Sequence, residues 1–183
     1  MDDSRDVVLS PDPRLFTQCA PIEKIDDGVR DLADHMLRVM YASDGCGLAG
    51  PQIGAMSQIV VIDVDYVGRG SKKNPYVLIN PQIVTADGPE RETMEGCLSF
   101  PGISVPVSRP SHVVVRAKNL DGDLMQYEAE GNLLAVCLQH EIDHVHGKTM
   151  VDHLSPLKRA EAMRACEEAI EAGAQPGETA VEE

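Results

Sequence analysis

The sequence predicts an α+β fold, with antiparallel β-sheets packed around a central helix and one further helix near each end of the chain. Three observations predict it. The run from Gly131 to Gly147 has helical length and is apolar on nearly every side, which is typical of a buried core helix. Six strand-like runs precede it, mostly joined by short turns, and this order favours antiparallel pairing. Helical patterns with polar caps lie before and after this region.

Two histidines and a glutamate share one side of the central helix. A helix turns by about 100° per residue, so if His140 is set at zero around the helix axis, His144 lies at about 40° and Glu141 at about 100°. One helical turn separates the histidines, so their ring nitrogens can converge on one ion. This is the H-E-x-x-H arrangement of a metal-binding helix with a built-in general base. The ordinary alternative is a chance pair of satisfied histidines, which a five-letter motif alone does not exclude.

Periodicity and turn residues place the other elements. Residues 1–25 are interrupted by prolines and are expected to form a surface loop. We expect a first helix from Asp26 to about Tyr41 and a last one from Ser155-Pro156 to about Glu171. Ser43–Gly54 holds four glycines and a proline, so no regular structure is expected there. The strand-like runs are Gln58–Val64, Tyr76–Ile79, Gln82–Ala86, Ile103–Val107, His112–Lys118 and Leu124–Ala129.

Length and composition fit one domain. A chain of 183 residues suits a single core, and we expect a catalytic domain over residues 1–172 and a disordered acidic tail over 173–183. The net charge of −14 argues against a nucleic-acid groove, which needs a basic surface. The N-terminus lacks the features of a targeting signal, and no apolar run has the length of a membrane span. Five cysteines without a CxxC pair are expected to be reduced thiols in a cytoplasmic protein.

A catalytic metal needs a third protein ligand and an open position. Cys137 shares the histidine face but lies about 10.5 Å along the axis from His144, too far for both to bind one ion. His146 and His153 lie beyond or near the helix end and are expected at the surface. Cys46 and Cys97 both lie in glycine-flanked irregular segments, and the residues alone leave the choice between them open.

Three motifs in order resemble those of bacterial peptide deformylases. They are Gly45-Cys46-Gly47-Leu48-Ala49-Gly50-Pro51-Gln52-Ile53-Gly54, Glu95-Gly96-Cys97-Leu98-Ser99 and Gln139-His140-Glu141-Ile142-Asp143-His144. The resemblance extends from about Leu9 to Lys158, and the joint occurrence of the motifs is highly specific. In the family the first motif usually begins Gly-x-Gly-Leu-Ala-Ala, and this chain has Gly50 in place of the second alanine. Losing that methyl is expected to loosen a loop of the site.

The resemblance implies a hydrolase that removes the N-formyl group from the N-terminal formylmethionine of new proteins and releases formate. It implies Cys97, His140 and His144 as ligands of one divalent metal, with water in the fourth position. Ferrous iron is the expected native ion, with zinc, nickel or cobalt as substitutes; ligand type alone would indicate zinc. Glu141 is then the general base, while the Gln52 side-chain amide and the Leu98 backbone N–H stabilise the charge that develops on the formyl oxygen.

The same resemblance makes the nascent polypeptide N-terminus the substrate. The backbones around Cys46, Gly47 and Gly96 are expected to pair with it by strand addition. Its methionine side chain is expected in an apolar slot formed by Leu133, Val136 and Cys137, which lie before His140 on the same helix face. Ordinary core packing is the alternative for these three residues.

Two rival functions stay open from the sequence. One is a zinc endopeptidase of the HExxH type, although such enzymes usually complete the site with histidine or glutamate rather than a thiolate. The other is an inactive paralogue that binds peptides, against which all the expected site residues argue. We expect a monomer with weak or no ribosome contact, because Lys158, Arg159 and Arg164 in the last helix are outnumbered by glutamates.

Overall fold

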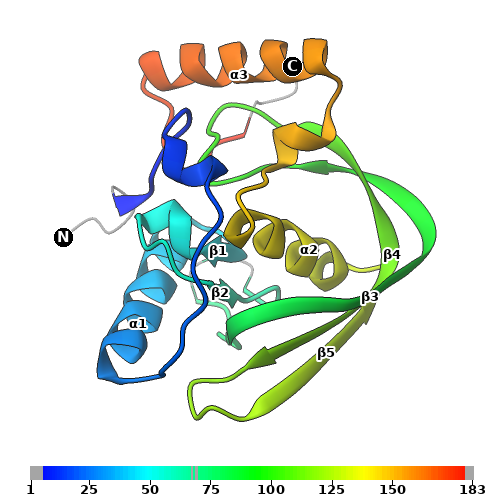
Figure 1. The fold of residues 1–183 in the computed structure, drawn as a ribbon. Coiled ribbons are helices and arrows are strands. Elements are labelled where there is room, and N and C mark those ends of the chain that lie inside the picture. The colour runs from blue at the N-terminus through cyan, green and yellow to red at the C-terminus, as the bar shows by residue number, and fades with distance from the viewer. Residues whose placement is uncertain (1–5, 67, 69, 180–183) are drawn as a thin grey trace.

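The computed structural model describes residues 6–66, 68 and 70–179. Its strands form one antiparallel sheet in the order β1-β2-β3-β4-β5. Three helices accompany the sheet, with α2 enclosed by it and α1 and α3 on the outside (Figure 1). The strands are β1 (Gly47–Ala49), β2 (Ile59–Ile62), β3 (Tyr76–Glu95), β4 (Val105–Lys118) and β5 (Leu124–Glu130). The α+β fold is as expected from the sequence.

The long pair β3 and β4 curves around α2 (Figure 1). Register shifts between Ile79 and Gln82 and between Asp87 and Glu90 interrupt its ladder. Such irregularities bend strands and increase their twist. The sequence predicted two shorter strands in place of β3 and two in place of β4, and that was wrong in detail. Pro81 and Pro110 lie at or beside the shifts, where a missing N–H costs little.

Polar caps fix where the helices begin. Asp26 caps α1 (Asp27–Ala42), accepting from Val29 N at 3.2 Å. Asn132 caps α2 (Leu133–Val145) in the same way, accepting from Ala135 N at 3.0 Å, and Ser155 caps α3 (Pro156–Glu171). Gly147 ends the central helix with a φ of 73°, which favours glycine. All three helices lie where the sequence predicted them, within two residues.

Alternation along β2 ties α1 and α2 to opposite faces of the sheet. Val60 and Ile62 belong to the core cluster that contains Leu138 and Ile142 of α2. Ile59 and Val61 point the other way and belong to the cluster that contains the buried methionines of α1. A third cluster lies under α3. Because β2 is buried on both faces, α2 is held in the interior and its polar groups face a cavity rather than bulk water.

Three segments expected to be irregular carry some structure. Within residues 1–25 a 3-10 helix, η2, spans Pro13–Phe16. Within Ser43–Gly54 the chain forms β1 and then the 3-10 helix η3 (Gly50–Ile53), because the glycines permit close packing against α2. Residues 173–179 of the expected disordered tail return to the body, where Gly102 N donates to Glu178 O at 2.7 Å. Residues 180–183 lie outside the described part.

Candidate active site

Three metal-ligating side chains converge where β3 ends beside α2. Cys97 follows β3 by two residues, and His140 and His144 project from α2 one turn apart. Their ligand atoms all lie within 4.8 Å of one another, and His144 Nε2 is 3.3 Å from Cys97 Sγ. The cysteine is 9% exposed and the two histidines are buried. Of the two thiols that the sequence left open, Cys97 is therefore the one that meets the histidines.

The donors are prepared for a divalent metal. Glu95 Oε2 lies 2.8 Å from His140 Nδ1, which fixes the ring and leaves Nε2 free for an ion, as carboxylates commonly do for ligating histidines. Burial lowers the pKa of His144 well below its usual value and keeps the imidazole neutral. Burial would lower the pKa of His140, but hydrogen bonds to Cys97 and Glu95 raise it well above its usual value, so an ion that binds Nε2 displaces a proton there. A cysteine and two histidines fit zinc or ferrous iron. The residues present therefore fit the metal that the motif implies.

A buried arginine holds this carboxylate in place. Arg109 on β4 donates to both oxygens of Glu95, at 2.6 and 3.0 Å, and to Asp143 at 2.9 Å. His153 also contacts Asp143, at 2.8 Å. Burial alone would raise the pKa of Glu95, but hydrogen bonds from His140 and Arg109 outweigh it and hold that pKa below its usual range. No sequence motif indicated Arg109, and His153 was expected at the surface, because the partners in this network are not neighbours along the chain.

Glu141 faces the pocket from the same helix. Its side chain is 4% exposed, and burial raises the pKa of its carboxyl to about 8. Its Oε2 has no hydrogen-bond partner among the described residues. A Cβ added to Gly47 would overlap the other carboxylate oxygen, so only glycine lets β1 pass this close. The site therefore holds a carboxyl group that takes or gives a proton near neutral pH.

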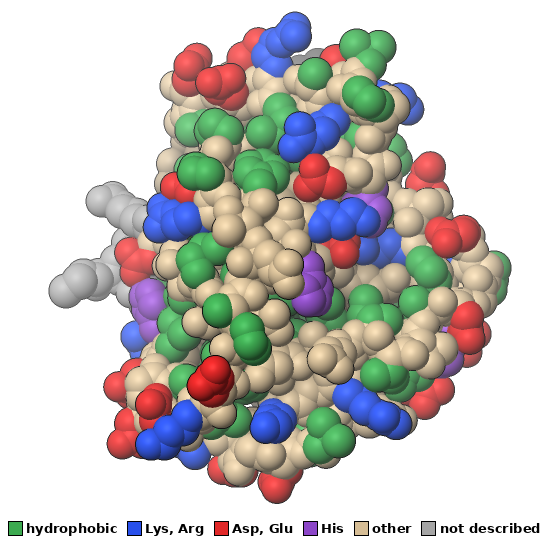
Figure 2. All heavy atoms as spheres, in the orientation of Figure 1, with side chains coloured by type: hydrophobic (Ala, Val, Ile, Leu, Met, Phe, Trp, Pro, Cys, Tyr) green, Lys and Arg blue, Asp and Glu red, His purple; other side chains and the backbone are tan. Residues whose placement is uncertain are grey.

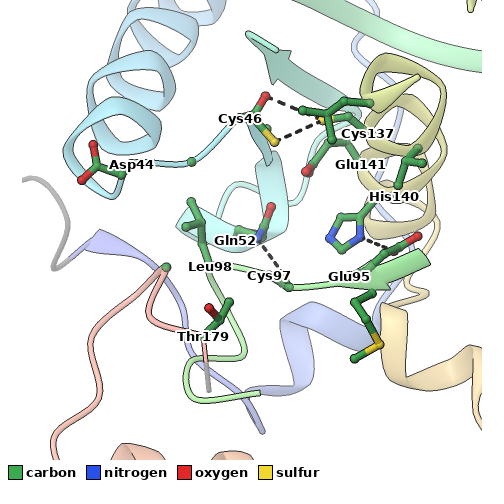
Figure 3. A pocket seen from close by; sticks show the side chains of 17 residues that line it. Asp44, Cys46, Gln52, Glu95, Cys97, Leu98, Cys137, His140, Glu141 and Thr179 are labelled. Atoms are coloured by element: carbon green, nitrogen blue, oxygen red, sulfur yellow. Dashed lines mark hydrogen bonds and ion pairs between the residues drawn. The ribbon is translucent and has the colours of Figure 1, made fainter. Parts of the chain in front are cut away.

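Gln52 is fixed with its amide nitrogen toward the metal ligands (Figure 3). Its Oε1 accepts from Ala49 N at 2.8 Å, which leaves Nε2 to donate to Ser99 Oγ at 3.2 Å and to Cys97 Sγ at 3.4 Å. The turn η3 positions it, and the side chain is buried. A preorganised N–H donor beside the ligands is what a developing oxyanion requires.

Gly50 is tightly packed rather than loose. A Cβ at this position would lie 2.6 Å from both Ala55 O and Ser57 O. Gly50 O also accepts from Ala55 N at 2.9 Å. The expectation that the missing methyl loosens the loop was wrong, because backbone carbonyls occupy the space that the methyl would need.

A pocket of about 240 Å³ opens onto these groups. It brings together the residues that the sequence singled out, apart from His144, which lies fully buried behind it. From the sequence-based set, the lining residues are Cys46, Gly47, Gln52, Gly96, Cys97, Leu98, Leu133, Val136, Cys137, His140 and Glu141. The helix residues Leu133, Val136 and Cys137 thus lie on the pocket wall, next to a second cavity that shares Leu133 and Val136.

Two tail residues also line this pocket and were not anticipated. Gly177 and Thr179 both line it. Thr179 lies on the side of Leu98, opposite the helix that carries His140 and Glu141 (Figure 3), and a Cβ added to Gly177 would lie 3.2 Å from Leu98 Cδ2. A Cβ on Gly96 would come within 2.9 Å of Thr179 Cγ2. The tail composition is polar and gave no sequence signal for this contact, since its packing depends on where α3 ends.

Comparison with known proteins decides the family. The family model described as polypeptide deformylase matches residues 4–160. The chain belongs to the peptide deformylase family. A peptide deformylase of Alkalilimnicola ehrlichii is 44% identical over 168 residues, covering 92% of each chain, and one of Hahella chejuensis is 47% identical over 149 residues, covering 81% of this chain and 86% of that one.

Solved structures agree with this assignment. A peptide deformylase from Legionella pneumophila matches with a TM-score of 0.83 at 43% identity, covering 91% of this chain and 95% of that chain. One from Synechococcus elongatus in complex with actinonin matches with a TM-score of 0.81 at 37% identity, covering 91% and 89%.

As a peptide deformylase, the chain is a metal-dependent hydrolase that removes the formyl group from N-terminal formylmethionine. The expected function is confirmed, and the endopeptidase and inactive-paralogue alternatives are not supported. In the part of the chain that the structure describes, no helix is both long and apolar enough to cross a membrane.

Proposed function

We propose that Cys97, His140 and His144 hold one divalent metal and that ferrous iron is the native ion. When bound, the metal supplies Lewis-acid activation of water and of the formyl carbonyl. The convergence of the three ligand atoms within 4.8 Å, beside Glu141 and Gln52, is the observation that carries this proposal. The Arg109–Glu95 pair keeps the His140 ring oriented for metal binding.

Glu141 serves as the general base and then as the acid. Its carboxylate takes the proton of the attacking water and returns it to the departing amine, so one group serves both halves of the reaction. Burial raises the pKa of Glu141 to about 8, closer to neutrality than that of an exposed glutamate, which suits a group that must both accept and return a proton. Gln52 Nε2 and the Leu98 backbone N–H donate to the formyl oxygen as it gains charge. The products are formate and a free amino terminus.

The substrate is a nascent chain that binds in extended form. Among the described strands, β1 pairs with β2 alone, so its other edge has no strand partner and can accept an added strand next to Cys46 and Gly47. Gly96 offers backbone on the opposite side of the pocket. The methionine side chain then enters the apolar slot beside Leu133, Val136 and Cys137. A peptide bound in this way would have its formyl carbon next to the metal ligands.

We further propose a cytoplasmic monomer without a nucleic-acid groove and with at most a weak ribosome contact. Figure 2 shows basic side chains scattered among acidic ones on the face it displays. In α3, Arg159 already pairs with Asp152 at 3.0 Å.

Formate release from a formyl-Met peptide by anaerobically purified protein tests the proposed function. Glu141→Gln should retain the metal and lose turnover by orders of magnitude, because an amide does not accept the proton. Gln52→Leu should reduce turnover by roughly 100- to 1000-fold. Near-normal turnover in Glu141→Gln would remove the general base from the proposal.

Metal content tests the ligand choice separately. Cys97→Ala should lose the single metal ion, whereas the matched variant Cys46→Ala should keep it. The reverse result would show that the wrong thiol was chosen. If iron is native, activity of the anaerobic protein should decay in air, since a ferrous thiolate site oxidises, while zinc-loaded protein should be stable.

A further inference from the structure

Two cysteines outside the ligand set face each other across the substrate pocket. Cys46 precedes β1 and Cys137 lies on α2, and their sulfur atoms are 4.0 Å apart (Figure 3). Cys137 Sγ also lies 3.6 Å from Cys46 O. Both residues line the pocket, Cys46 half-buried and Cys137 buried. Neither thiol has a part in the proposed reaction.

The separation is short enough for a bond. A disulfide needs about 2.05 Å between sulfurs, so the pair must close by roughly 2 Å. Rotation about the two side chains and a small backbone shift supply such a distance. Glycines flank Cys46 on both sides, and a Cβ added to Gly47 would lie 2.8 Å from Cys137 Sγ, so the backbone beside Cys46 already packs against the partner thiol. Cys97, by contrast, contacts a histidine, since its Sγ lies 3.3 Å from His144 Nε2.

The two thiols also differ in reactivity. The hydrogen bond from Cys137 lowers the pKa of Cys46 to about 7 and outweighs the effect of burial, whereas the pKa of Cys137 is raised by the same contact. Burial raises the pKa of both Cys19 and Cys166 to about 11. Thiolates are the species that peroxides oxidise, so Cys46 is the thiol that reacts first.

We propose that Cys46 and Cys137 are a peroxide-sensitive pair that forms a reversible disulfide within the substrate pocket. The Cys46 thiolate attacks one oxygen of hydrogen peroxide, the O–O bond breaks, and Cys46 sulfenic acid forms as the released hydroxide takes a proton to become water. Cys137 sulfur then attacks that sulfenic sulfur, and the hydroxyl leaves with the Cys137 proton as a second water. The thiols lose two electrons, which reduce the peroxide, and a small dithiol reverses the step.

The bond has a functional consequence that rests on the proposed function. Cys137 belongs to the methionine slot, and the Cys46 backbone is placed to pair with the substrate. Joining the sulfurs ties β1 to α2 across that slot and narrows it. Cys97 stays free to hold the metal, so the oxidised protein keeps its ion while it loses formyl-Met hydrolysis.

Peptide mapping of the full-length, zinc-loaded protein tests the proposal, because zinc itself does not change redox state. After limiting hydrogen peroxide and quenching of free thiols, non-reducing digestion should yield a Cys46–Cys137 cross-linked peptide lighter by two hydrogens than its separate parts. Activity should fall in proportion to the cross-linked fraction, with zinc retained, and should return with dithiothreitol. Oxidation confined to Cys97, with Cys46 and Cys137 still alkylated, would overturn it.

Variants separate this proposal from its basis. Cys46→Ser and Cys137→Ser, each compared with its own untreated sample, should form no cross-link and keep their fraction of activity. The matched control Cys166→Ser, in α3, should behave as the wild type. A cross-link without any activity in the untreated protein would count against the proposed function alone. Full activity with no cross-link at saturating peroxide would overturn the disulfide alone.

Discussion

At the scale of single residues, Gly50 stands where the family motif usually has alanine. Its missing Cβ is replaced by the carbonyl oxygens of Ala55 and Ser57, each 2.6 Å from where the methyl would stand. The alanine that the motif usually carries therefore does not fit this chain. We expect Gly50→Ala to destabilise the fold by about 1 to 3 kcal/mol through overpacking, measured as a lower Tm.

The same substitution elsewhere is the control for that prediction. Gly28 lies exposed in the first turn of α1, with only Asp26 Oδ1 nearby, at 3.3 Å from an added Cβ. Alanine favours a helix over glycine by up to about 1 kcal/mol, so Gly28→Ala should be neutral or stabilising. An equal loss of stability in both variants would show that the Gly50 contacts are not the cause.

Val136 tests where the methionine side chain binds. Burying such a side chain contributes about 1.5 to 3 kcal/mol, so formyl-Met peptides should exceed formyl-Ala peptides by roughly one to two orders of magnitude in kcat/KM. Val136→Phe should fill the slot and reduce kcat/KM for formyl-Met far more than for formyl-Ala, with metal content unchanged. Equal losses for both peptides would place the slot elsewhere.

At the scale of elements, the sequence predicted what depends on local pattern. Caps and periodicity located all three helices, and the motif on α2 located two ligands and the adjacent glutamate. Strand continuity was missed because the expected strands stop at the register shifts of the β3–β4 pair, between Ile79 and Gln82 and after Ala86. The site was predictable where residues follow each other in a motif. Arg109 was not, because its link to Glu95 exists only after β3 and β4 pair.

Arg109 joins β4, β3 and α2 through two buried carboxylates. Arg109→Met leaves Glu95 and Asp143 without their cation, which should cost about 3 to 5 kcal/mol at neutral pH, measured by urea unfolding. The pKa values of both carboxyls are lowered from their usual 4.5 and 3.8 in the folded wild type. Such groups stabilise the fold above their unfolded-state pKa, and this contribution is lost as the pH falls through the lowered folded-state pKa.

The deficit of Arg109→Met should therefore be largest near pH 7 and shrink in acid, where both proteins protonate these carboxyls. Arg116→Met, an exposed change on the same strand, is the matched control and should stay within about 0.5 kcal/mol at every pH. A deficit independent of pH would assign the loss to packing of the arginine stem instead of its charge.

At the scale of the whole molecule, both ends of the chain depend on the core built around α2. The N-terminal segment joins the sheet through Ala20, which bridges to Ser57, and Cys19 N donates to Val145 O at 2.9 Å. The tail returns from α3 to the pocket wall at Gly177 and Thr179. The sequence did not predict this return, because contacts between distant segments leave no local pattern. The active site is therefore assembled from most of the chain's length.

The charge of the whole molecule determines how strongly it can bind the ribosome. Binding to RNA phosphates weakens with salt by nearly one power of the salt concentration for each phosphate neutralised. The chain carries a net charge of −14, and α3 contains four glutamates against the three cations Lys158, Arg159 and Arg164. Arg159 is already paired with Asp152. We expect weak or no salt-sensitive binding to ribosomes in co-sedimentation between about 50 and 200 mM salt. A steep fall of affinity with salt, abolished by truncation after Leu157, would show instead that α3 presents its cations to phosphates in spite of the surrounding acids.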